Sequence, residues 1–113
     1  MKLEQLKFSA LGPVFHFHEH PEFREPLRVK LDDFLIVIAG NGEGSPYLKG
    51  EFRDAAGEVF PLICFLDDAS ELRVKSQLSM IESRPFVEVE GQLFDWAVEC
   101  GVTLLQCKLV QPA

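Results

Sequence analysis

The chain has 113 residues, 47% hydrophobic and 26% charged, which is enough for one domain with a single hydrophobic core. Its formal charge of -7 repels polyanions at long range and disfavours nucleic-acid binding driven by net charge alone. The longest apolar run, residues 34–39, is too short to cross a bilayer, so we expect no membrane insertion. The three cysteines form no CxxC pair, which favours reduced thiols in a cytoplasmic, acidic protein.

Residues 1–31 mix a weak helical start with an FHFHEH run and a segment rich in proline, and we predict an N-terminal extension here. In a strand, His16, His18 and His20 would project from one face, with successive Cα atoms about 6.5 to 7 Å apart, so two could share a zinc ion. A strand that buries the intervening phenylalanines explains the same alternation without a metal. Because the nearby Glu19 would point to the other face, we favour the strand without metal.

A mainly β domain is predicted for residues 32–113. The run FLIVIAG, residues 34–40, has the composition of a buried strand. YLKGEFRD, residues 47–54, alternates as a half-buried strand, and a connection containing Gly57 joins it to the apolar run EVFPLICFL, residues 58–66. These two runs predict a hairpin.

A single helix is predicted next, because Val74, Leu78 and Ile81 recur at helical spacing. Asp68 and Glu71 are spaced as an N-cap and its reciprocal carboxylate, and a following proline closes the helix. FVEVEGQL and GVTLLQCKLV then return to strand patterns. The predicted order is therefore three strands, one helix and two strands.

This order resembles the oligonucleotide/oligosaccharide-binding (OB) fold, a five-stranded Greek-key barrel with a helix between its third and fourth strands. The resemblance covers residues 32–110 and is carried by YLKGEFRDAAGEVFPLICFLDD and PFVEVEGQL. A barrel this small needs sharply bent strands, and Gly40, Gly50, Gly91 and Pro61 offer places to bend. The N-terminal extension has no counterpart in the minimal barrel.

The resemblance implies a ligand lying across the second and third strands, with loops 41–46 and 95–101 beside it. That surface would present Tyr47, Lys49 and Arg53, with Phe60 as an aromatic from the third strand. An aromatic ring with nearby cations suits single-stranded nucleic acid, although alternating charges also occur on an ordinary solvated sheet face.

We therefore expect a non-enzymatic binding module without a cofactor, and single-stranded nucleic acid is the leading ligand. The alternative is a protein-interaction or assembly domain that pairs through the N-terminal segment or a sheet edge with a partner or its own copy. Metal binding by the histidine cluster is a minor alternative. The sequence contains no glycine-flanked nucleophile or other complete catalytic signature, so we expect no catalysis.

Overall fold

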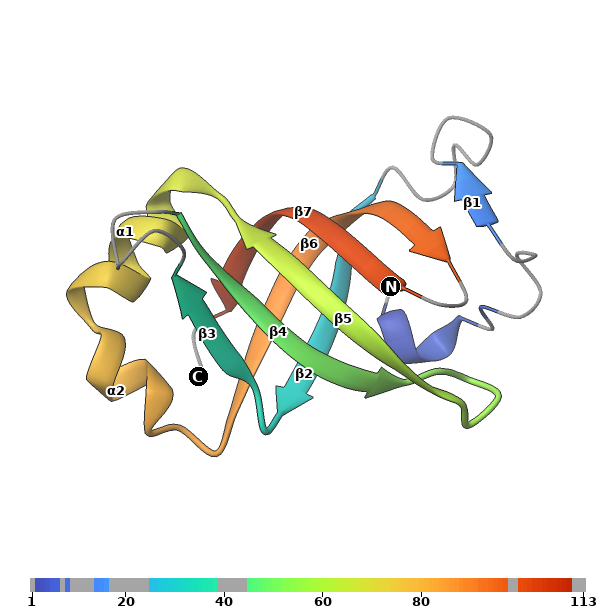
Figure 1. The fold of residues 1–113 in the computed structure, drawn as a ribbon, viewed down its shortest axis with the longest axis horizontal. Helices are drawn as coiled ribbons and strands as arrows, with labels where there is room; N and C mark the ends of the chain where they lie inside the picture. Colours follow the sequence, from blue (N-terminus) through green and yellow to red (C-terminus); the bar gives the residue numbers. More distant parts are fainter. Residues whose placement is uncertain are drawn as a thin grey trace.

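The computed structural model describes residues 2–6, 8, 14–16, 25–38, 45–97 and 100–110, with the backbone alone for 14–16. Seven strands among these residues form one sheet that curls into a half-barrel, with two short helices at one end and a 3-10 turn at the other (Figure 1). The elements are η1 (Leu3–Gln5), β1 (Val14–His16), β2 (Leu27–Asp32), β3 (Leu35–Ile38), β4 (Pro46–Arg53), β5 (Val59–Leu66), α1 (Asp68–Ser76), α2 (Leu78–Glu82), β6 (Phe86–Ala97) and β7 (Gly101–Val110).

The pairing of the strands explains the curl. The sheet runs in the order β1, β6, β7, β5, β4, β3, and β2 also pairs with β6. Because β2 leads directly into β3, this stretch of chain pairs with β6 near one end of the sheet and with β4 near the other. β5 and β7 are parallel, whereas every other pair is antiparallel. Between β2 and β3, Asp33 takes a φ of 51°, a left-handed conformation that aspartate tolerates better than most residues.

The prediction of a mainly β protein is confirmed, but the count of five strands was wrong. Six strands of four or more residues are present in the described part of the chain, in addition to the three-residue β1. The main omission is β2, which begins at Leu27, within the segment predicted as an extension. Its pattern LRVKLD alternates, with Leu27, Val29 and Leu31 buried, so the signal was present in the sequence.

The helical segment also differs from the prediction. Its N-cap is Asp67 and not Asp68, since the Asp67 carboxylate accepts a hydrogen bond of 2.9 Å from the Ser70 N–H. The helix is interrupted at Gln77, so α1 and α2 replace the single helix expected. Val74 and Ile81 nevertheless face the core, as their spacing predicted.

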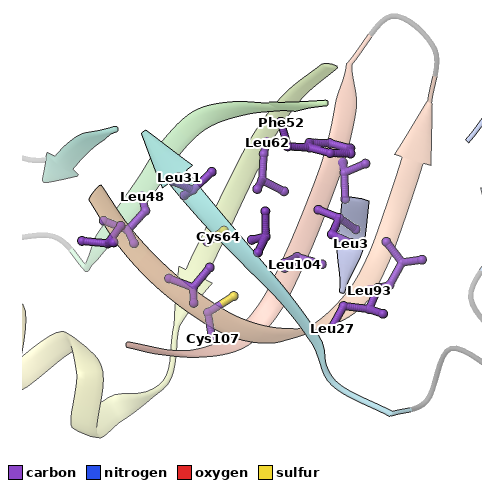
Figure 2. Close-up of a cluster of buried hydrophobic side chains, with 14 of the residues drawn as sticks. Leu3, Leu27, Leu31, Leu48, Phe52, Leu62, Cys64, Leu93, Leu104 and Cys107 are labelled. Carbon is purple, nitrogen blue, oxygen red and sulfur yellow. The ribbon is translucent and has the colours of Figure 1, made fainter. Parts of the chain in front are cut away.

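The core fills the space that the sheet encloses (Figure 2). Side chains from alternate positions point inward, among them Leu31, Leu48, Leu62 and Leu104. Cys64 and Cys107 are buried here too, and their hydrogen bond, together with burial, raises the pKa of the Cys64 thiol well above its ordinary value. Cys64 therefore stays protonated, and both cysteines serve as packing residues.

The bends predicted at glycine and proline are realised only in part. Gly91 lies at an irregularity of the β6–β7 register, and a Cβ there would stand 2.3 Å from the Cys107 Sγ. The pairing of β4 with β5 runs through Pro61 without a shift, and the pairing of β5 with β7 starts one residue later. Gly40 lies outside the described residues.

An aromatic cluster at the end opposite the helices includes a residue of the N-terminal segment. Phe8 is fully buried, with ring centroids 5.4 Å from Phe52, 6.3 Å from Phe60 and 4.8 Å from Trp96. Leu3 is also fully buried. Both side chains therefore belong to the hydrophobic core of the described structure.

Asp54 connects the N-terminal segment to the turn between β4 and β5. Its Oδ2 accepts a hydrogen bond of 3.1 Å from the Phe8 N–H. Its Oδ1 accepts hydrogen bonds of 2.9 Å from the Ala56 N–H and 3.0 Å from the Glu58 N–H. The carboxylate is nearly buried, so these backbone N–H groups depend on it as their hydrogen-bond acceptor.

We expect Asp54→Ala to lower the free energy of unfolding by about 2 to 3 kcal/mol, because three backbone N–H groups lose their acceptor. Urea unfolding followed by tryptophan fluorescence measures this loss. Glu58→Ala is the matched control, since it removes an exposed carboxylate from the same turn. A loss no larger than that of the control would contradict the role assigned to Asp54.

Candidate functional site

Side chains of β3, β4 and β5 that point away from the core form a continuous surface, here called the outer face. Burial alternates along β4 and β5, and the register of β3 with β4 places Leu35 and Val37 on the same side as Lys49 and Tyr47. The outer face consists of Leu35, Val37, Tyr47, Lys49, Glu51, Arg53, Val59, Pro61, Ile63 and Phe65. Most of these side chains are apolar or aromatic, and several are well exposed.

An aromatic pair lies at one end of the outer face. Tyr47 and Phe65 stand directly opposite each other on β4 and β5, with ring centroids 5.5 Å apart and planes inclined by 50°. Phe65 is 43% exposed and Tyr47 is partly exposed, so both rings offer surface to a ligand. Val37 is the cross-strand neighbour of Tyr47 on β3. The pair provides flat apolar surface held by paired strands.

The cations of the outer face lie along β4. Lys49 is exposed and stands between Leu35 on β3 and Ile63 on β5. Arg53 is also exposed, and its Nη1 donates a hydrogen bond of 2.8 Å to the carbonyl of Gly57, which holds the guanidinium beside the turn. Three of the four predicted binding residues, Tyr47, Lys49 and Arg53, therefore share one surface, as predicted from the alternation of β4.

Carboxylates limit the positive charge of this surface. Glu51 lies between the two cations on β4. A hollow of about 470 Å³ is lined by Lys49 and Glu51 together with Asp32, Asp33, Leu35, Gly50 and Pro61. Since three carboxylates and one ammonium group line it, the hollow repels phosphate. The outer face thus favours contacts with aromatic and apolar groups over contacts with many phosphates.

Phe60 is not on the outer face. It is buried, and its ring lies 4.7 Å from that of Trp96 in the aromatic cluster. EVFPLICFL is almost entirely apolar, so its own pattern does not show which side chains point inward and which point outward. The register of the hairpin determines the direction of each side chain, because it sets Phe60 opposite the buried Phe52 and Phe65 opposite Tyr47. Phe65 is the aromatic residue that the sequence analysis missed.

The predicted histidine cluster lies in a part of the chain whose side chains the structure does not describe. The backbone of His16, in β1, pairs with that of Asp95 in β6. The side chain of His16 and all of His18 and His20 lie outside the described part of the chain. Within the described ranges, no group of three or more His, Cys, Asp or Glu side chains is placed to hold a metal ion. Residues 41–44 and 98–99 of the predicted ligand loops are likewise outside the description.

A second polar surface, on β2 and β6, carries paired charges. Arg28 Nη2 and Glu90 Oε2 are 3.2 Å apart, and Lys30 stands opposite Glu88. The Lys30 ammonium also lies 4.3 Å from the centroid of the Phe86 ring. Exposed pairs of this kind contribute little to stability and leave little net charge for an anion. The outer face is therefore the stronger candidate.

Comparisons with protein families, with curated proteins and with solved structures found no match for this chain. No helix in the described part of the chain has the length and apolar character needed to cross a bilayer.

Proposed function

We propose that this chain is a non-enzymatic binding module of the OB type, which binds single-stranded nucleic acid across the outer face. The connectivity supports this fold: β2 and β3 would be two halves of one bent first strand, pairing with β6 and β4 respectively. The helices lie between β5 and β6, and β5 pairs in parallel with β7. This order would give the five strands of an OB barrel.

The single observation that carries the proposed ligand is the exposed Tyr47–Phe65 pair. Bases stack on aromatic side chains with about 1 to 3 kcal/mol for each base, and every base offers such a face. Lys49 lies two residues from Tyr47 along β4, within reach of a phosphate next to a stacked base. With few cations and several carboxylates nearby, stacking supplies most of the affinity, and we expect binding that tolerates many sequences.

Tyr47→Ala and Phe65→Ala should each weaken binding of a labelled single-stranded oligonucleotide by about 1 to 3 kcal/mol, roughly 5-fold to 150-fold in Kd. Each substitution removes one stacking surface, and both side chains are partly exposed, so the fold should tolerate the change. Fluorescence anisotropy at low salt measures the Kd. Double-stranded DNA of the same length should bind more weakly, because its bases are not available for stacking.

Leu72→Ala serves as the control, since Leu72 is 68% exposed on α1 and lies away from the outer face. Its Kd should equal that of the unaltered protein.

If Lys49 and Arg53 each neutralise one phosphate, log K should fall with log salt with a slope of about -1.4. The proposal fails if the oligonucleotide shows no anisotropy change at high protein concentration, or if the aromatic variants bind as well as the control.

A further inference from the structure

The strand β3 is an edge of the sheet without the usual protection. In the described part of the chain it pairs only with β4, and its sequence LIVI contains no charge, proline or glycine. Sheet edges are normally protected by lysine, proline, bulges or a covering segment. β2 shows such protection, because Lys2 forms a bridge with Arg28 and charged residues alternate along the strand. Leu35 of β3, by contrast, is 63% exposed.

The pairing with β4 determines which backbone groups β3 presents at its edge. Ile38 stands opposite Pro46, which has no N–H and cannot take part in a mutually hydrogen-bonded pair. Ile38 is therefore in a non-hydrogen-bonded position, and by alternation Ile36 is too. The N–H and C=O groups of these two residues point away from β4, whereas those of Leu35 and Val37 point toward it. The edge thus presents a regular set of donors and acceptors.

The same strand of a second copy fits this edge. In an antiparallel pair with Ile36 opposite Ile36 of the other copy, Leu35 lies opposite the other Val37, and both belong to the outer face. The partly buried Ile36 and Ile38 lie on the inner side in both copies. Outer-face residues of one copy therefore lie opposite outer-face residues of the other, and inner residues lie opposite inner residues, as strand pairing in one sheet requires. The edge N–H and C=O groups of Ile36 form hydrogen bonds with those of Ile36 in the other copy. Those of Ile38 form hydrogen bonds with the N–H and C=O groups of Phe34 in the other copy.

Charge favours this edge over the rest of an acidic surface. Residues 34–38 carry no charge, although the chain has a net charge of -7. In the register above, the Asp33 residues of the two copies lie six positions apart, about 20 Å, which exceeds the Debye length of about 8 to 10 Å. Repulsion between these carboxylates is therefore weak. Leu3 and Phe8 are buried in their own core, so they are unavailable for assembly.

We propose that β3 pairs antiparallel with β3 of a second copy, forming a two-fold homodimer with one continuous sheet. This proposal does not depend on the nucleic-acid proposal. The contact is short, so we expect a weak dimer, with Kd on the order of 10 to 100 µM. Because the outer faces would lie on the same side of the joined sheet, dimerisation would place two Tyr47–Phe65 pairs on one surface.

Sedimentation and hydrogen exchange on the full chain, without nucleic acid, test the dimer. Between about 10 µM and about 500 µM the sedimentation coefficient should rise from monomer to dimer. Over the same range the amide protons of Ile36 and Ile38 should exchange at least about fivefold more slowly. Those of Leu35 and Val37, which bond to β4, should not change. A monomer at every concentration would overturn the proposal, as would a dimer without protection at Ile36 and Ile38.

Leu35→Glu should raise the dimer Kd at least about tenfold, because the new carboxylates of the two copies would lie about 7 to 8 Å apart. Within the chain the new carboxylate faces Lys49, so the monomer should keep its fold. Leu72→Glu introduces the same charge at an exposed site on α1 and should leave the Kd unchanged. Equal Kd values for the two variants would contradict pairing at β3.

Discussion

Gly101→Ala should lower the free energy of unfolding by about 3 to 5 kcal/mol, a large part of the stability of a small domain. Gly101 begins β7 with a φ of 80°, a conformation that costs an alanine about 1 to 2 kcal/mol. A Cβ at this position would also stand 2.1 Å from the carbonyl oxygen of Pro61, so backbone would have to move. Urea unfolding measures the loss.

Gly57→Ala separates the two contributions. Gly57 has a φ of 83°, but a Cβ there meets no atom within 4 Å. This control should lose only the conformational part, about 1 to 2 kcal/mol. Similar losses for the two variants would show that β5 and β7 do not approach as closely at Pro61 as the structure indicates.

Phe8→Ala should lower the free energy of unfolding by about 3 to 5 kcal/mol, because it empties the centre of the aromatic cluster. Trp96, the single tryptophan of the chain, contacts Phe8 and is fully buried. Its fluorescence emission should therefore shift to longer wavelength if water enters the space left by the ring. Chemical unfolding and the emission spectrum can be recorded on the same sample.

Phe94→Ala is the matched control, since it makes the same substitution at a side chain that is 53% exposed on β6. We expect it to lower stability by less than about 1 kcal/mol and to leave the tryptophan emission unchanged. If both variants lose the same free energy, the ring of Phe8 contributes no more to stability than an exposed ring does.

The sequence predicted the strands with clear boundaries and missed those defined by tertiary contacts. β4 and β6 follow alternation that the amino-acid pattern shows directly, and β7 was predicted from a final apolar run. β2 was missed although LRVKLD alternates, because it directly follows the proline-bearing segment PEFREP, and its pairing with the distant β6 is not evident from local pattern. The break at Gln77 depends on how the helical segment packs, which local helical spacing does not reveal.

For the candidate site, local pattern was sufficient on one strand only. In β4, polar and apolar residues alternate, so Tyr47, Lys49 and Arg53 could be assigned to one side from the sequence. In β5, both sides are apolar, and identifying Phe65 instead of Phe60 as the aromatic residue of the outer face requires the cross-strand register. Residues 34–40 have the composition of a buried strand, but in the described part of the chain β3 pairs only with β4 and Leu35 is exposed. The direction of its backbone groups depends on Pro46 being opposite Ile38.

The parallel pair of β5 and β7 has a kinetic consequence. Cys64 is paired with Leu104, so the chain must pass through both helices and all of β6 before these strands can meet. The entropy of closing that long loop is lost before any contact between the two strands is gained. Contact order, and not the rapid formation of α1, should therefore set the folding rate of this domain, on the slow timescale typical of small β proteins.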